Sequence, residues 1–167
     1  TIAALRPVDA GHGRGIAERR LRLDSIQKNC IRFTNAHSTG PYTEAAMPGI
    51  LTSSYYLEYG RQKKLPDQRT LISQPLKKCG IKTAGFHSNP YLSRFFGWDR
   101  DWDIFYDSME EEVDDKSPYI KAVQLNQKVD SWLSSFVNES SPDSIFLWLH
   151  YMDVHEPYVP DQKYIKN

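Results

Sequence analysis

The stretch Ser144-Ile145-Phe146-Leu147-Trp148-Leu149-His150 decides the fold class of this chain. It is a nearly continuous apolar run that follows the turn-forming pair Pro142-Asp143. Such a run is typical of a strand that is buried on both faces, as in a parallel sheet with helices packed on each side. The run therefore predicts a buried strand inside a helix-covered sheet.

The segments before this strand alternate between helical and strand-like patterns. Apolar residues recur at helical intervals from Pro118 to Phe136, which predicts an amphipathic helix. Ile81 to Phe86 alternates apolar and polar residues and predicts a strand, and Thr70 to Lys78 predicts a helix that Gly80 closes. Strands that alternate with helices indicate an α/β domain with a largely parallel sheet.

A similar unit begins near residue 30. Cys30 to Phe33 predicts a short strand, and a loop rich in turn-forming residues follows it. Thr43 is a favourable helix cap and Glu44 a favourable first-turn charge, so a helix is expected from Thr43 through Leu51.

Three polar loops have the position that functional loops take in parallel sheets. Reactive groups in such sheets gather beyond the carboxyl ends of the strands. Residues 37–43, 87–93 and 151–160 follow predicted strands in this way. These loops hold the candidate functional side chains.

Two further segments have a structural interpretation. Aromatic residues are frequent between Tyr91 and Tyr106, which predicts a loop that packs its rings against the edge of the sheet. Asp107 to Lys116 is acidic and is expected to form a solvated loop or a helix start.

The composition excludes several partners. The chain has 21 Lys and Arg and 21 Asp and Glu, so its formal net charge is zero. A neutral chain has no bulk field that attracts nucleic acid or an anionic membrane surface. No stretch reads as a membrane span, and the first residues do not form a signal peptide. We expect no nucleic-acid partner, and the localisation stays unknown.

Three segments together resemble the sulfatase family of the alkaline phosphatase superfamily, in its prokaryotic and archaeal type. Residues 33–43 resemble the nucleophile region and put Thr43 on the nucleophile position, and Gly85–Ser93 and Phe146–Tyr158 resemble the next two landmarks in the expected order. The resemblance implies an alkaline-phosphatase-like α/β fold. In it, residues 1–167 form a partial sulfatase domain that is incomplete at its carboxyl-terminal side.

The resemblance also implies a set of roles. Thr43 is the nucleophile, held on a divalent cation at a helix start, where N–H groups and a partial positive charge favour a tetrahedral anion. His155 donates a hydrogen bond to the anion or a proton to the leaving oxygen. His150 and Asp153 orient the substrate, and His87 binds it.

Each of these side chains also has a purely structural interpretation. Thr43 is a good helix cap, and His155 suits an exposed loop. His87 is typical of a buried structural histidine, and Asp153 of a residue that caps a loop. The sequence leaves both interpretations open.

The chain departs from the family at the nucleophile. Classical sulfatases carry a Cys or Ser there, which is oxidised to formylglycine. A threonine side chain cannot give that aldehyde. In related enzymes that transfer or hydrolyse phosphoryl groups, a threonine hydroxyl attacks directly and forms a covalent intermediate.

The predicted metal site is also incomplete. Where the family carries metal-binding aspartates after its first strand, this chain has Ala3 and Val8, with Asp9 one place late. Asp9 joins Thr43 as the candidate metal ligand, and a hard cation such as calcium or magnesium is favoured over zinc or manganese. The family supplies further ligands from strands that would follow Asn167.

These observations lead to one interpretation and two alternatives. The first is a sulfatase-like hydrolase that acts on a small sulfated substrate with a divalent cation. The second is a phosphate-ester hydrolase or phosphoryl transferase that uses Thr43 as nucleophile on a small phosphorylated substrate. The third is a catalytically inactive interaction module of the same fold. A missing carboxyl-terminal part would leave a sheet edge unpaired, which predicts self-association.

Overall fold

The computed structural model describes residues 31, 33–112, 118–139 and 144–158, without the side chains of residues 137–139. The chain divides after Thr39 into two units. In the first unit, His37 Nε2 lies 2.8 Å from Asn35 Oδ1. The strand predicted for residues 30–33 is tested only in part, because Cys30 and Arg32 lie outside the described residues, whereas Ile31 and Phe33 belong to no strand.

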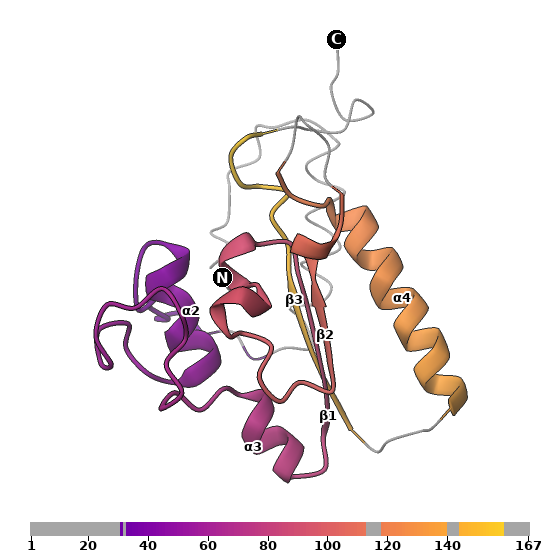
Figure 1. The fold of residues 1–167 in the computed structure, drawn as a ribbon, viewed down its shortest axis with the longest axis horizontal. Helices are drawn as coiled ribbons and strands as arrows, with labels where there is room; N and C mark the ends of the chain where they lie inside the picture. Colours follow the sequence, from indigo (N-terminus) through magenta and orange to yellow (C-terminus); the bar gives the residue numbers. More distant parts are fainter. Residues whose placement is uncertain (1–30, 32, 113–117, 140–143, 159–167) are drawn as a thin grey trace. The chain divides into compact units, whose positions relative to one another are not determined.

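The second unit is built on a parallel sheet of three strands with the order β2-β1-β3 (Figure 1). The strands are β1 (Lys82–His87), β2 (Ile104–Asp107) and β3 (Ile145–His150). The helices are α2 (Thr43–Thr52), α3 (Ser73–Lys78) and α4 (Ala122–Glu139), with 3-10 turns η1 (Pro90–Leu92), η2 (Arg94–Phe96) and η3 (Ser108–Glu110). The predicted α/β class with a parallel sheet is confirmed.

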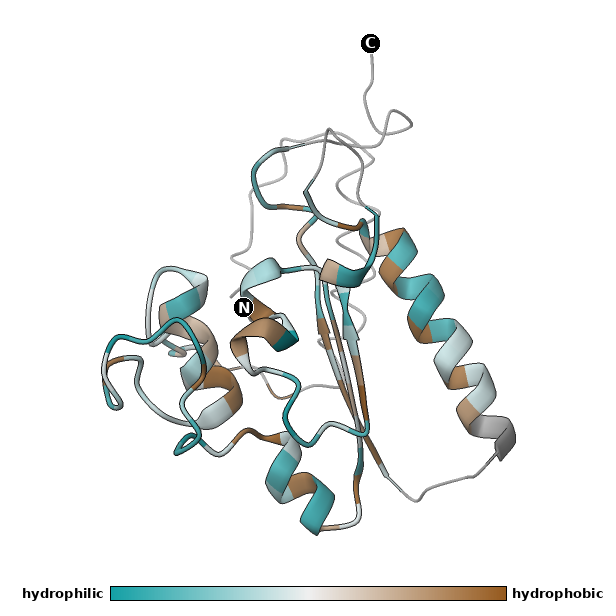
Figure 2. Ribbon diagram, viewed as in Figure 1, coloured by the Kyte–Doolittle hydropathy of each residue, from teal (hydrophilic) through white to brown (hydrophobic). Residues whose placement is uncertain are grey.

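Helices cover both faces of the sheet, with α4 on one side and α2 and α3 on the other (Figure 1). Alternate residues of a strand point to opposite faces, so each face has its own core. Phe86 and Ala84 of β1 pack with Leu125 and Val129 of α4. On the opposite side, Trp102 packs with residues of α2 and the loops around it. Figure 2 shows hydrophobic residues along the strands and at intervals along α4.

Gly85 explains how the second core approaches the sheet so closely. A Cβ atom at this position would lie 3.1 Å from the Phe105 ring and 3.4 Å from the Trp102 ring. The missing side chain therefore lets both rings pack directly over β1, where Trp102 also stacks on Trp148 with ring centroids 6.0 Å apart.

Three sequence predictions need correction. The segment predicted as a loop between Tyr91 and Tyr106 ends in the edge strand β2. Asp107, predicted in a solvated segment, is only 2% exposed. The strand buried on both faces is β1, since residues 146–150 of β3 are only half-buried and, in the described part of the chain, β3 pairs with β1 alone.

Two helix boundaries also shift. α3 begins at Ser73 rather than Thr70, which puts Pro75 in the first turn, where its missing N–H costs no hydrogen bond. α4 begins at Ala122 rather than Pro118. None of the helices within the described residues is long and apolar enough to cross a membrane.

Candidate active site

The first turn of α2 carries the predicted nucleophile. Thr43 is the first residue of this helix, and the Tyr42 carbonyl accepts hydrogen bonds from Ala45 and Ala46 at 3.1 and 2.9 Å, which close the turn. Ala45, Met47 and Leu51 are buried and hold the helix against the sheet layer. The Thr43 hydroxyl is thus fixed at the positive end of the helix dipole.

A second side chain positions this hydroxyl. Asn89 follows β1 and is 2% exposed. Its Nδ2 donates to Thr43 Oγ1 at 3.4 Å, while its Oδ1 accepts from the Tyr91 backbone N–H at 3.0 Å. The bond to Tyr91 fixes the amide on η1, and the longer contact puts its Nδ2 beside the Thr43 hydroxyl. Asn89 was not among the predicted site residues, although an Asn before Pro90 is a recognisable cap signal.

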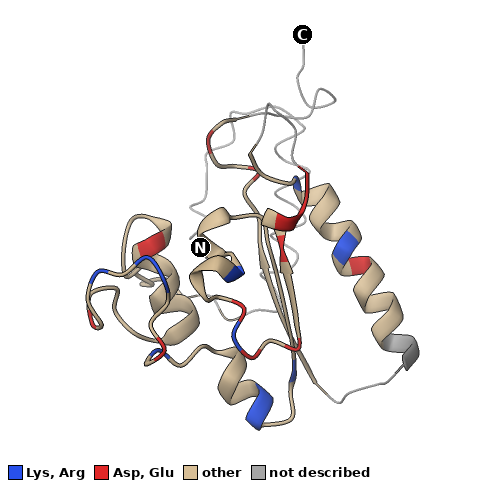
Figure 3. Ribbon diagram, viewed as in Figure 1, with Lys and Arg blue, Asp and Glu red and all other residues tan. Residues whose placement is uncertain are grey.

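Three titratable side chains end the three strands next to this contact. His87 lies opposite His150 on one side and Asp107 on the other in the strand register. All three have the strand parity of Gly85, Phe105 and Trp148, so they lie on the face that α2 covers. Figure 3 shows the acidic residues at the end of β2 and on η3.

His87 and Asp107 lie side by side and buried. His87 Nε2 lies 3.5 Å from Asp107 Oδ1, and the two side chains are 0% and 2% exposed. This distance is too long for a good hydrogen bond. Asp107 instead accepts backbone N–H bonds from Arg94 at 2.7 Å and Met109 at 3.0 Å. Asp107 therefore fixes the two turns that follow β1 and β2.

Burial keeps both strand-end histidines neutral near neutral pH. It lowers the pKa of His87 to about 4, against the opposing pull of the Asp107 carboxylate, and the neighbouring His150 lowers it further. Burial also lowers the pKa of His150. A neutral imidazole at His87 suits a structural or hydrogen-bonding role more than one as a cationic anion binder.

The loop after β3 holds the remaining predicted residues. His155 is exposed, and its Nδ1 lies 2.7 Å from the Glu156 carbonyl oxygen. Since a carbonyl only accepts, Nδ1 carries the proton, which leaves Nε2 as the acceptor in the neutral ring. Asp153 binds the Ala122 N–H through both carboxylate oxygens at 3.0 and 2.9 Å and so caps α4.

A hollow of about 30 Å³ opens beside Thr43. Its lining includes two exposed cations, Lys63 and Lys64, and the buried Arg69. Arg69 is engaged within the fold, since its guanidinium donates to Ser54 and to the carbonyls of Tyr55 and Tyr56. Lys63 and Lys64 are therefore the exposed cations in the lining of this hollow.

The structure thus brings together some of the predicted residues. Thr43 contacts the end of β1 through Asn89, and His87 and His150 lie at adjacent strand ends. Asp153 and His155 lie on the loop after β3, where the described contacts of Asp153 are structural and His155 packs edge-on against Tyr119 at 5.5 Å. Asp9 lies outside the described residues.

Polar side chains near Thr43 are already engaged in other contacts within the described residues. The Asn89 oxygen is used by Tyr91, and Glu44 Oε2 accepts from the Tyr56 hydroxyl at 3.4 Å. Within the part of the chain that the structure describes, no three His, Cys, Asp or Glu side chains gather as metal ligands do. The divalent cation and Asp9 as its ligand stay predictions.

Solved structures define the class of fold. The C-terminal periplasmic domain of EcEptC from Escherichia coli, in complex with zinc, has a TM-score of 0.57 and 15% identity, over 86% of this chain and 40% of that one. A protein of the alkaline phosphatase superfamily from Vibrio parahaemolyticus has the same TM-score and identity, over 81% and 35%. This chain therefore has an alkaline-phosphatase-like α/β fold and spans less than half the length of either structure.

The family follows from the sequence itself. A family model described as Sulfatase matches residues 13–167, and a search of curated proteins gives no match. The chain belongs to the sulfatase family. The resemblance inferred from three sequence segments is confirmed.

Proposed function

We propose that this chain carries the attacking hydroxyl of an ester hydrolase or transferase, and that its substrate is a small sulfated or phosphorylated ester. The contact between Thr43 and Asn89 carries the proposal. It holds a hydroxyl at a helix start, where backbone N–H groups and the helix dipole favour a tetrahedral anion. Membership of the sulfatase family supports the same chemistry.

The proposed reaction is a substitution at sulfur or phosphorus. Thr43 Oγ forms a bond to the central atom as the bond to the alcohol oxygen breaks, and the alcohol leaves with a proton. The hydroxyl proton of Thr43 passes to solvent. Water then cleaves the Thr43 ester and releases sulfate or phosphate, or a second alcohol takes the group.

Thr43 also supports a second candidate substrate. Because threonine cannot form the aldehyde of classical sulfatases, direct attack is the route left to it. Direct attack by a hydroxyl is the chemistry of the phosphoryl-handling relatives that the sequence analysis considered. A phosphate ester is therefore the second candidate beside a sulfate ester, and the same residues serve both.

The test compares the turnover of ethyl sulfate and ethyl phosphate by three variants. Thr43→Ala is expected to lower kcat/KM by at least about 1,000-fold, since it removes the nucleophile, and Thr43→Ser is expected to keep part of the activity. Thr52→Ala, at the opposite end of α2, is the matched control and should keep full activity. Peptide mapping of an acid-quenched reaction should find the covalent group on Thr43.

Two results would contradict the proposal. Unchanged turnover in Thr43→Ala would put the nucleophile elsewhere. No turnover of either ester by the unmodified chain, with no label on Thr43, would favour the alternative of an inactive interaction module with the same fold.

A further inference from the structure

We propose that an apolar groove beside the candidate site binds the alcohol part of the ester, and that this alcohol is a neutral, apolar group. The inference rests on the proposed function, because it assigns the anionic end of the substrate to Thr43. It adds the chemistry of the other end. The groove is formed by η1, η2 and η3, and nothing in the reaction proposed above uses it.

The groove has the size and lining of a small-molecule site. Its volume is about 460 Å³, within the range of roughly 300–1,000 Å³ that is usual for ligand pockets. Tyr91, Phe95, Phe96 and Met109 form its apolar lining. Phe95, Met109 and Tyr91 are 68%, 58% and 51% exposed, so three large apolar side chains face solvent in one place.

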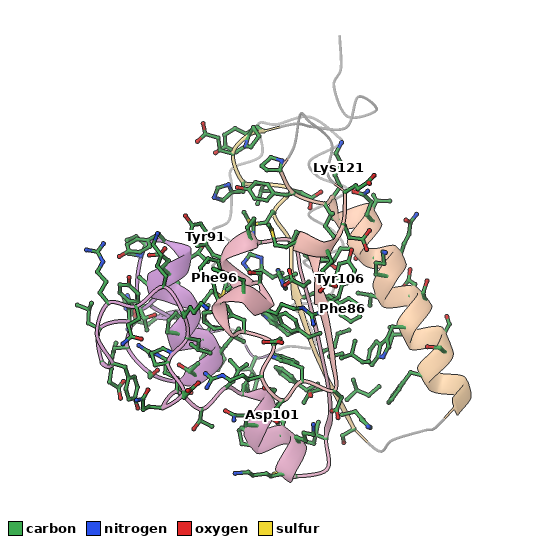
Figure 4. The ribbon with its side chains drawn as sticks, viewed as in Figure 1. Phe86, Tyr91, Phe96, Asp101, Tyr106 and Lys121 are labelled. Carbon is green, nitrogen blue, oxygen red and sulfur yellow. The ribbon has the colours of Figure 1, made fainter. Side chains whose placement is uncertain are left out.

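The aromatic wall is ordered by contacts between its own rings. Tyr91 stacks on Phe96 with centroids 6.1 Å apart, and Phe95 meets Phe96 edge-on at 5.0 Å. Figure 4 shows Tyr91 and Phe96 on the two short turns between α2 and the sheet. A wall that is already fixed loses little side-chain entropy when a ligand packs against it.

The groove and the hollow at Thr43 share the wall that Tyr91 forms. Tyr91 lines both, and its backbone N–H is held by the same Asn89 that contacts the Thr43 hydroxyl. Lys64 lines the hollow and has its ammonium 4.7 Å from the centre of the Phe95 ring. One ligand can therefore have an anion near Thr43 and the lysine, and an apolar group along the aromatic wall.

The charges of the groove disfavour a second anion in it. Arg94 is the cation of this groove, and it is neutralised by Glu110 at 3.0 Å and by Asp107 at 3.8 Å. Glu110 is 61% exposed at the rim and repels negative groups. These charges disfavour an anion in the groove, and the apolar lining favours a neutral, apolar group.

The test measures selectivity between two alcohols of similar leaving ability. The full 167-residue chain is assayed with the sulfate and phosphate esters of 2-phenylethanol and of ethanol. The 2-phenylethyl esters are expected to have a kcat/KM about 10- to 100-fold higher, as expected for burial of one phenyl group. Phe95→Ala and Met109→Ser should lower this ratio toward one, whereas Tyr55→Ala, at a 73% exposed residue outside the groove, should keep it.

A binding measurement separates this inference from the proposed function. NMR titration with free 2-phenylethanol should shift signals of Tyr91 and Phe96, and Phe95→Ala should weaken the binding even in a Thr43→Ala background. Binding of the alcohol without turnover of any ester would sink the proposed function and keep the groove assignment. Two results would overturn the groove assignment. One is turnover of all esters with equal kcat/KM. The other is self-association that Phe95→Ala abolishes, together with failure of the alcohol to bind.

Discussion

Two loops follow neighbouring parallel strands at the same end of the sheet, and they differ in how deeply their residues are buried. In the loop after β1, Ser88, Asn89, Leu92 and Ser93 are each at most 3% exposed. In the loop after β3, residues 153–158 are exposed and Met152 is buried. The strands themselves end in register, and the Ser88 N–H donates to the His150 carbonyl at 3.0 Å.

The difference shows that a loop's position after a parallel strand makes it a candidate for a functional site. The elements packed around the loop decide whether its side chains are held in place before a substrate binds. The loop after β1 lies between the start of α2 and the end of β2, which supply Thr43 and Asp107 as partners. The loop after β3 has described contacts chiefly with the start of α4. A site needs side chains that are held in place before the substrate arrives, so the first loop is the better-ordered half of the candidate site.

The largest expected effect is a difference in the free energy of unfolding between matched substitutions in the two loops. Leu92→Ala should lower the free energy of unfolding by about 3–4 kcal/mol, because the side chain is fully buried and leaves a cavity in the core. Val154→Ala, the matched change in the other loop, should stay within about 0.5 kcal/mol, because Val154 is 86% exposed. Urea unfolding measures both, and equal losses would show that the loops do not differ in this way.

The second effect is the pH dependence of stability that His87, the last residue of β1, produces. The pKa of His87 is about 4 in the folded chain and about 6.5 in the unfolded chain. Between these values the unfolded chain binds more protons, so stability falls as the pH falls through this window and the loss is complete below it. The cost reaches about 3 kcal/mol, since each pKa unit is worth about 1.4 kcal/mol.

Two variants test this assignment. His87→Gln should flatten the stability curve between pH 6.5 and pH 4, because it removes the buried group that resists protonation. His155→Gln changes an exposed histidine and should keep the slope of the unmodified chain. Stability curves of His87→Gln and the unmodified chain that run parallel would assign the pH dependence to another group.

The fold was largely predictable because its strongest sequence signals are periodic. Alternation in β1 and the amphipathic pattern of α4 follow from burial on one side, and both elements were predicted within a few residues. β2 was missed because Ile104-Phe105-Tyr106-Asp107 is short and lies behind a run of aromatic residues that pack on the sheet. The burial of β3 was overestimated because an apolar run shows only that the side chains are hydrophobic. How deeply a strand is buried also depends on the strands that pair beside it.

The site was less predictable than the fold. Thr43 was found through the family resemblance and Asn89 was not, since its role depends on a contact across 46 positions of sequence. Asp107 was predicted to be exposed to solvent, because runs of acidic residues usually are exposed. It is buried instead, because the two turns whose N–H groups it binds cover it. The groove depends on how three short turns pack together, and no periodic pattern predicts that.

The smallest expected effect is a loss of stability that distinguishes Asp153 as a helix cap from Asp153 as a substrate-binding residue. Its carboxylate accepts from the Ala122 N–H, so Asp153→Ala should lower stability by about 1 kcal/mol, as the loss of a helix cap does, and Asp153→Asn by a few tenths. Asp130→Ala, an exposed change within α4, is the control and should be neutral. Urea unfolding and amide exchange at Ala122 measure the loss. Unchanged stability together with lost ester turnover in Asp153→Asn would instead assign this carboxylate to the substrate, as the family resemblance implies.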